Sequence, residues 1–259
     1  MTKLIEFKDP RGATLRGLFD PARSSVGVIF LHGFEHSTVE YKFKNLVDAW
    51  RGHYNLWRFD LPGCGLSDGE FSDFTISGAA DVLRLAVRQL RRLAPQLKEI
   101  IFVGHSAAGS IVLEYLKSEA RTFNKMILLA PAFNQAALLR YYFARQTHRD
   151  EKITWGNYEK FFSPVAFKLS LRVPRIMRKA HYLKNNYFKE SADCDYQEYF
   201  SSIDFDWSSL TIVHGDADDK VPLPSNDKLP RAARLIVVKG GDHELERPDM
   251  VKQYLRKII

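Results

Sequence analysis

The chain has 259 residues, of which 45% are hydrophobic and 27% are charged, a balance typical of a folded globular protein and not of a disordered one. The length suits a single α/β domain with a large core. No apolar run approaches the roughly 20 residues that span a bilayer, and residues 1–7 lack the long apolar stretch of a secretory signal. We therefore expect a cytoplasmic protein without integral membrane association. Cys64 and Cys194 are the only cysteines, which predicts neither a disulfide framework nor a metal cluster.

Apolar runs and helical spacing predict an alternation of strands and helices along most of the chain. Two short segments, 4–7 and 14–19, are expected to form an antiparallel hairpin ahead of the core. Parallel strands are then predicted at 26–31, 54–59, 99–103, 125–129, 210–213 and 234–238. Helices are predicted at 39–50, at 76–93 and from Pro248 through Leu255. The fold class is therefore α/β, with a mostly parallel sheet of about eight strands and helices on both faces.

One predicted strand runs directly into a turn made of small residues. The segment 99–103 is followed by Gly104-His105-Ser106-Ala107-Ala108-Gly109, and a helical pattern begins at once. A serine at such a sharp strand-to-helix turn is typical of the G-x-S-x-G nucleophile elbow. The sequence departs from that pattern at Ala108, because the second glycine stands one residue later. Taken alone, Ser106 is better interpreted as an ordinary helix N-cap.

Candidate acids and a candidate base follow two later strands. The loop after 210–213 carries three carboxylates, Asp216, Asp218 and Asp219, and the strand at 234–238 leads into His243. A serine hydroxyl is a weak nucleophile unless a base takes its proton and a third group orients that base. The carboxyl ends of parallel strands meet at one edge of a sheet. The sequence therefore predicts that Ser106, one of these aspartates and His243 act together.

Four motifs together resemble the α/β-hydrolase superfamily, and more narrowly its serine aminopeptidase-like group, which contains monoacylglycerol lipases and cinnamoyl or feruloyl esterases. They are His32-Gly33-Phe34, the segment from Asp60 to Gly69, the serine turn, and the paired acid and histidine loops. The resemblance leaves only the middle segment unmatched. In the family the acid lies three residues after the glycine of an H-G-x-x-D-x-x-V-P loop. Gly215 and Val221-Pro222 place Asp218 there, in preference to Asp216 and Asp219.

The resemblance implies an α/β-hydrolase fold in which Ser106, Asp218 and His243 are catalytic. It also implies an oxyanion hole formed by the backbone N–H groups of Phe34 and Ala107. Such chemistry needs no metal and no cofactor. Structural roles are expected for His32, His105 and His214 as hydrogen-bonding residues and for Asp60 and Asp68 in fixing their loop. Solvent exposure is expected for His36, His53, His148 and His181.

Residues 131–205 break the alternation and are too long for a loop between strands. We predict a helical lid inserted into a core domain formed by 1–130 and 206–259. The lid contains 16 of the chain's 33 aromatic residues. We expect some of these rings to line an acyl or aryl pocket and the majority to dock the lid on the core.

The formal net charge is +7, and the predicted lid contributes +4 of it. Within the lid, Arg172, Arg175, Arg178, Lys179 and Lys184 form a basic run. Interspersed acidic residues favour a solvated helix face, and no nucleic-acid motif is present. We therefore expect no nucleic-acid partner, while attraction of an anionic substrate or an acidic lipid surface stays open.

Two classes of function fit these observations. The first is a serine esterase that cleaves a small carboxylic ester with an apolar or aromatic part through an acyl-enzyme; thioesterase and peptidase activities use the same residues. The second is a non-catalytic protein of this fold that binds a ligand under its lid. A complete set of three reacting groups favours the first. The sequence carries no signal for the oligomeric state.

Overall fold

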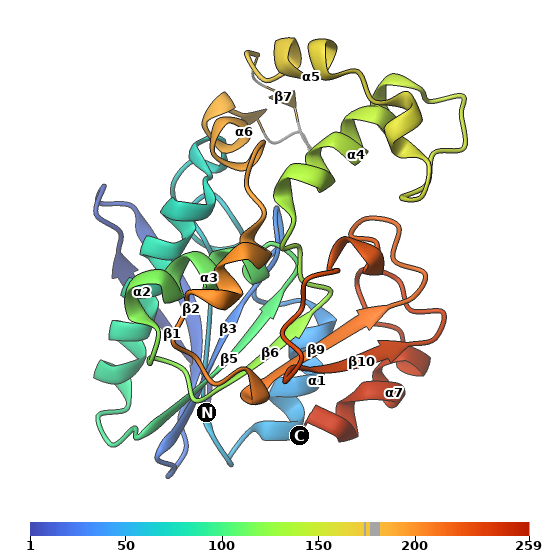
Figure 1. The fold of residues 1–259 in the computed structure, drawn as a ribbon. Coiled ribbons are helices and arrows are strands. Elements are labelled where there is room, and N and C mark those ends of the chain that lie inside the picture. Colours follow the sequence, from blue (N-terminus) through green and yellow to red (C-terminus); the bar gives the residue numbers. More distant parts are fainter. Residues whose placement is uncertain (174, 177–181, 259) are drawn as a thin grey trace.

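The computed structural model describes residues 1–173, 175–176 and 182–258, and an eight-stranded sheet forms its centre (Figure 1). The strand order is β1-β2-β4-β3-β5-β6-β9-β10. Strand β2 runs antiparallel to both of its neighbours, and all other neighbouring strands are parallel. The strands are β1 Lys3–Lys8, β2 Thr14–Asp20, β3 Val26–Leu31, β4 Asn55–Phe59, β5 Glu99–His105, β6 Lys125–Leu129, β9 Leu210–Gly215 and β10 Arg234–Val238.

Four long helices cover the two faces of the sheet (Figure 1). Helices α2 (Ile76–Leu93) and α3 (Ala108–Glu119) pack on one face, and α1 (Tyr41–Trp50) and α7 (Pro248–Ile258) pack on the other. Each buries an apolar stripe against the sheet, as amphipathic helices do. The predicted α/β-hydrolase architecture, including the antiparallel hairpin, is confirmed.

The predicted boundaries agree with the structure to within about two residues for most elements. The last helix, predicted through Leu255, continues to Ile258, and two strands are longer than predicted at their carboxyl ends. Strand β5 continues to His105, which pairs with Leu129, and β9 continues to Gly215, which pairs with Val238. The sheet pairing therefore extends to the residue directly before Ser106 and to the glycine that begins the acid loop, so both loops start from rigid backbone.

The segment between β6 and β9 begins beyond the carboxyl ends of the central strands, where α4, α5 and α6 lie, and its last part returns past α3 to the amino end of β9 (Figure 1). It contains α4 Gln135–Thr147, η2 Tyr158–Phe161, α5 Pro164–Ser170, β7 Arg175–Ile176, β8 Tyr182–Leu183, α6 Asn185–Ser191, η4 Tyr196–Ser201 and η5 Trp207–Ser209. Helix α6 is held to the core through Glu190, whose carboxylate accepts hydrogen bonds from the first two backbone N–H groups of α2, at 2.6 and 2.9 Å. A carboxylate is favourable at a helix N-terminus because it meets unpaired N–H groups and the positive end of the helix dipole.

Several sequence expectations concern residues away from the site. His53 and His148 are exposed, as expected. His181, Arg178 and Lys179 lie outside the described residues. Cys64 and Cys194 are not joined in a disulfide; Cys64 is buried and Cys194 is half-buried. Within the described part of the chain, no helix combines the length and the apolar character that crossing a membrane requires.

Candidate active site

Ser106 occupies a strained backbone position between β5 and α3. Its φ is +54°, in the left-handed region that residues other than glycine seldom adopt. The backbone N–H donates to the Leu129 carbonyl at 3.0 Å, and the Ser106 carbonyl accepts from the N–H groups of Gly109 and Ala132, both at 2.9 Å. The turn is thereby fixed by three hydrogen bonds, which keep the hydroxyl in a defined place.

The departure from G-x-S-x-G at Ala108 has a steric explanation. A Cβ built at Gly104 would lie 2.9 Å from the Ala108 methyl and 2.7 Å from the ring of Phe102. Room for one methyl group therefore exists at this turn, and Ala108 already fills it. Glycine is required at 104 and alanine is accommodated at 108.

His243 lies between Ser106 and Asp218. Its Nε2 is 3.0 Å from Ser106 Oγ, and its Nδ1 is 2.8 Å from Asp218 Oδ2. An ionised carboxylate only accepts hydrogen bonds, so the Nδ1 proton points at Asp218 and Nε2 is left to accept from the serine. All three residues are buried. The structure brings together the three side chains that the sequence selected.

Asp218 is held as an anion by its surroundings. Its Oδ1 accepts from the N–H groups of Lys220 and Val221, at 3.0 and 2.8 Å. Burial alone would raise the pKa of Asp218, but hydrogen bonds from His214, His243 and Val221 lower it well below its usual range. The carboxylate is therefore ionised at every pH near neutrality.

The two competing aspartates of the acid loop (residues 215–222) point elsewhere. Asp216 is exposed and its Oδ1 accepts from the Gly240 N–H at 2.6 Å. Asp219 is also exposed, and its Oδ2 lies 3.2 Å from Arg145 Nη2. Among the three carboxylates, Asp218 is the one in contact with His243.

Phe34 and Ala107 stand beside Ser106, as an oxyanion hole requires. A Cβ at Gly33 would lie 3.0 Å from both Ser106 Cβ and His105 Nδ1, so only glycine lets the loop after β3 approach the serine this closely. Within the described residues, no hydrogen bond engages the backbone N–H of Phe34 or of Ala107. Both donors are therefore available to a substrate oxygen.

The three histidines that border the motifs are buried and hydrogen-bonded to backbone groups, as expected. His32 Nε2 accepts from the Leu61 N–H at 3.0 Å, His105 Nε2 lies 3.0 Å from the His243 carbonyl, and His214 Nε2 lies 2.8 Å from the Val221 carbonyl. Burial lowers the pKa of both His32 and His105, which keeps these rings neutral. They support the loops that carry Ser106, Asp218 and His243.

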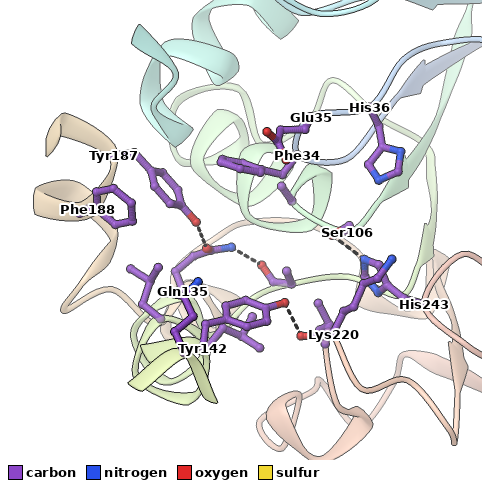
Figure 2. A pocket seen from close by; sticks show the side chains of 16 residues that line it. Phe34, Glu35, His36, Ser106, Gln135, Tyr142, Tyr187, Phe188, Lys220 and His243 are labelled. Carbon is purple, nitrogen blue, oxygen red and sulfur yellow. Dashed lines mark hydrogen bonds between the residues drawn. The ribbon is translucent and has the colours of Figure 1, made fainter. Parts of the chain in front are cut away.

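A cavity of about 400 Å³ opens onto Ser106 (Figure 2). Its walls come from the Phe34 loop, the serine turn, α4, α6 and the two loops that carry Asp218 and His243. The lining residues are Phe34, Glu35, His36, Ser106, Ala107, Ala132, Gln135, Leu138, Leu139, Tyr142, Gln146, Tyr187, Phe188, Lys220, Val221 and His243. Tyr187 and Phe188 lie on the opposite side from His36 and His243 (Figure 2), so the cavity has an aromatic end and a charged end.

Polar side chains fix the aromatic end. Tyr187 Oη donates to Gln135 Oε1 at 2.8 Å, and Gln135 Nε2 donates to the Ala132 carbonyl at 2.8 Å (Figure 2). Tyr142 Oη donates to the Lys220 carbonyl. Of the aromatic residues in 131–205 whose side chains are described, these two tyrosines and Phe188 line the cavity, and the others pack against the core or against one another. Most of the described rings in this segment therefore pack against other residues and do not line the cavity.

Sequence reasoning missed the charged end of the site. His36, which was expected at solvent, is mostly buried and pairs with Glu40; this expectation was wrong because the His36 ring packs edge-on against the ring of His105. His36, Glu40 and Glu244 bring ligand atoms within 4.8 Å of one another, but Lys42 pairs with both carboxylates. The group is therefore an ion-pair cluster. Lys42 did carry a signal, because it shares a helical stripe with Leu46 and Trp50.

The fold and the buried serine, histidine and aspartate are the features of a known protein family. The model of the alpha/beta hydrolase family matches residues 28–253. The chain belongs to this family. It is also 30% identical over 110 residues to the uncharacterized hydrolase YugF of Bacillus subtilis (strain 168); that match spans 42% of this chain and 37% of YugF.

Solved structures share the fold across nearly the whole chain. Est1E from Butyrivibrio proteoclasticus, with ferulic acid bound, superposes with a TM-score of 0.71 and 20% identity, covering 98% of this chain and 96% of Est1E. The Pyrococcus furiosus esterase Pf2001 gives a TM-score of 0.63 and 18% identity, covering 99% and 86%. Mouse alpha/beta hydrolase domain-containing protein 10 gives 0.66 and 16%, covering 99% and 96%. At these identities the likeness concerns the fold.

The electrostatics predict how the reactivity of Ser106 depends on pH. The lowered pKa of Asp218 keeps that carboxylate ionised in mild acid, so the acid loop causes no loss of reactivity there. Protonation of His243 Nε2 would remove the acceptor for the serine proton. We expect labelling of Ser106 by a fluorophosphonate to be slow in acid and to reach a plateau in mild alkali. A labelling rate that peaks at about pH 4 would exclude His243 as the base.

Proposed function

We propose that this protein is a serine hydrolase that cleaves small carboxylic esters through an acyl-enzyme intermediate. The observation that carries the proposal is the continuous line of contacts from Ser106 Oγ to His243 and on to Asp218, 3.0 and 2.8 Å long, on the floor of a cavity with two unengaged backbone donors. A protein that only binds a ligand has no need for this arrangement or for the strained turn.

In the acylation half, Ser106 Oγ attacks the ester carbonyl carbon while its proton passes to His243 Nε2. Asp218 holds the ring in the tautomer that makes this transfer possible and stabilises the resulting imidazolium. The carbonyl oxygen gains a negative charge, which the N–H groups of Phe34 and Ala107 stabilise; such a donor is worth about 3 to 4 kcal/mol in the transition state. The intermediate collapses, the alcohol leaves with the proton from His243, and an acyl-Ser106 ester remains.

The deacylation half repeats these steps with water. His243 takes a proton from a water molecule as the water oxygen attacks the acyl carbon. The same two backbone N–H groups hold the second oxyanion. When the intermediate collapses, the acid leaves and Ser106 recovers its proton from His243. Over the two halves one ester and one water molecule give one alcohol and one acid, and the enzyme recovers its starting protonation.

The cavity favours an ester with an apolar or aromatic acyl part. Its volume of about 400 Å³ suits a small molecule, and Phe34, Tyr187 and Phe188 offer ring surfaces near Ser106. The fold relative Est1E binds ferulic acid, which agrees with an aryl acyl group. Residues 131–205 serve in this proposal as the lid that supplies much of the acyl wall.

Thioester and peptide substrates remain alternatives within the same chemistry, and a panel of acyl lengths, hydroxycinnamate esters, thioesters and aminoacyl amides separates them. The non-catalytic alternative predicts no turnover of any member. Hydrolysis that is abolished in Ser106→Ala supports the proposal, whereas hydrolysis retained by that variant contradicts it.

Substitutions in the acid loop test whether Asp218, and not Asp216 or Asp219, acts with Ser106 and His243. We expect Ser106→Ala and His243→Ala to lower p-nitrophenyl ester turnover by several orders of magnitude without unfolding. Asp218→Asn should lower turnover by on the order of 10⁴, because the amide favours the wrong imidazole tautomer. Asp216→Asn and Asp219→Asn are the matched controls from the same loop and should stay near wild-type. Near-normal turnover in Asp218→Asn, with a collapse in either control, would reassign the acid.

Two adjacent tyrosines of α4 test the proposed acyl wall. Tyr142 lines the cavity, whereas Tyr141 packs against Trp155 and Tyr158; both hydroxyls donate to carbonyl groups of the acid loop. An acyl group that loses about 60 Å² of contact at about 25 cal/mol per Å² loses about 1.5 kcal/mol, or roughly tenfold in kcat/KM. We expect Tyr142→Ala to lower kcat/KM for p-nitrophenyl cinnamate roughly tenfold more than for p-nitrophenyl acetate.

Tyr141→Ala is the control for loss of a ring and of a loop contact, and it should change both esters in equal proportion. The two esters share a leaving group, so only the acyl part differs. If Tyr142→Ala also changed both esters equally, the cavity wall would be a structural support and the acyl group would bind elsewhere.

A further inference from the structure

Lys42 carries an ammonium group that has no solvent exposure, on the inner face of α1. Its Nζ lies 3.2 Å from Glu40 Oε2, 3.1 Å from Glu244 Oε2 and 3.2 Å from Glu246 Oε1. A lysine is almost never fully buried unless it is paired, and a buried ion pair resists separation because each ion alone would be left without compensation. Lys42 therefore ties the loop that carries His243 to helix α1.

Glu244 extends this contact to the acid loop. Its Oε1 accepts from Lys220 Nζ at 2.5 Å, and the backbone N–H of Lys220 donates to Asp218 Oδ1 at 3.0 Å. Glu244 also directly follows His243 in the chain. We call this arrangement the Lys42–Glu244–Lys220 bridge. It joins the helix that follows the Phe34 loop to both loops that supply the acid and the base.

Lys42 and Glu244 are both charged near neutral pH. Burial alone would raise the pKa of Glu244, but the Lys42 and Lys220 ammonium groups lower it to about 2. Burial alone would lower the pKa of Lys42, but Glu40, Glu244 and Glu246 raise it above its ordinary value. Ion pairs that are shielded from solvent are screened by salt much less than surface pairs, so the bridge persists at physiological ionic strength.

The backbone beside the bridge needs such support. Leu245, the next residue, has a φ of +55°, and the N–H groups of Glu244 and Leu245 both donate to Asp242 Oδ1, at 3.1 and 3.0 Å. A leucine in the left-handed region persists only where the surroundings fix it. The bridge supplies one of those constraints from outside the loop.

We propose that Glu244 is a positioning residue for the hydrolytic reaction. Through the Lys42–Glu244–Lys220 bridge it fixes the His243 imidazole between Ser106 and Asp218, and so sets the rate of the chemical step and not the binding of substrate. Small displacements of a reacting group lower the rate of the chemical step strongly, since that step requires the reacting atoms to be in near contact. The inference rests on the proposed ester hydrolysis, because that reaction is the one it accelerates.

The test replaces Glu244 by an uncharged residue of the same shape. Glu244→Gln should lower kcat for p-nitrophenyl acetate about tenfold or more while KM stays within about twofold. Glu246→Gln is the matched control, because it removes one carboxylate from the same Lys42 ammonium, whereas among the described residues the ion pair with Lys220 is made by Glu244, which directly follows His243. It should keep kcat near wild-type. Thermal midpoints of both variants identify any loss that comes from unfolding.

A second variant removes Lys220, the partner of Glu244 in the acid loop. Lys220→Met should lower kcat in the same direction, and the double variant with Glu244→Gln should be less impaired than the product of the two single effects, because both changes remove one link. Equal kcat losses in Glu244→Gln and Glu246→Gln, at equal thermal midpoints, would overturn the proposal. The bridge would then only stabilise the fold.

Fluorophosphonate labelling of Ser106 separates failure of this inference from failure of the proposed function. If the wild-type protein is labelled but hydrolyses no ester, ester hydrolysis is wrong, and the labelling rates of the two glutamine variants alone decide on the bridge. Slower labelling in Glu244→Gln than in Glu246→Gln supports it, and equal rates overturn it. A wild-type protein that reacts with neither probe nor ester overturns both proposals.

Discussion

The site depends on the backbone strain at Ser106 and on the sheet that holds it. Ser106, with its positive φ, is fixed by one hydrogen bond from its N–H group to β6 and by two that its own carbonyl accepts. The carbonyl of Ala132, whose N–H group makes one of these bonds, accepts in turn from Ser110 Oγ and Gln135 Nε2. The other left-handed residues besides glycine in the described chain are Glu35, Ala130 and Leu245. All of them lie in loops at the same edge of the sheet. Strain is concentrated where the proposed chemistry occurs, a pattern common at functional sites.

Electrostatics divide the surroundings of the serine into a neutral part and a charged part. The buried rings of His32 and His105 are kept neutral by desolvation and act through hydrogen bonds to the backbone. The charges are gathered on the other side, where Lys42 and Lys220 face the glutamates of the ion-pair cluster. This separation leaves the His243 imidazole as the group that changes charge in the proposed cycle, while its neighbours keep theirs.

Hydrophobic periodicity and motif spacing predicted the elements of the sheet and the loops of the candidate site. The strands, the helices on the faces of the sheet and the loops that carry Ser106, His243 and the candidate aspartates follow from apolar runs, because parallel strands bring those loops to one edge. The resemblance to the α/β-hydrolases was needed to select Asp218 among the aspartates. Lys42 and Gln135 could not be assigned in this way. Their roles depend on partners far away in the chain, Glu244 and Tyr187, and a single polar residue on a helix does not identify its partner. The expectation for His36 was wrong because its ring packs against His105, which lies far away in the chain.

Helix α4 links the wall of the cavity to the support of the acid. Tyr141 Oη donates to the Asp219 carbonyl at 3.1 Å, Arg145 Nη1 donates to the same carbonyl at 2.8 Å, and Tyr142 Oη donates to the Lys220 carbonyl. These carbonyls belong to the turn whose N–H groups hold the Asp218 carboxylate. The insertion and the core are distinct in the chain, but these contacts join them. A displacement of α4 would move the acid loop with it, so the proposed acyl wall at Tyr142 and the orientation of His243 are mechanically coupled.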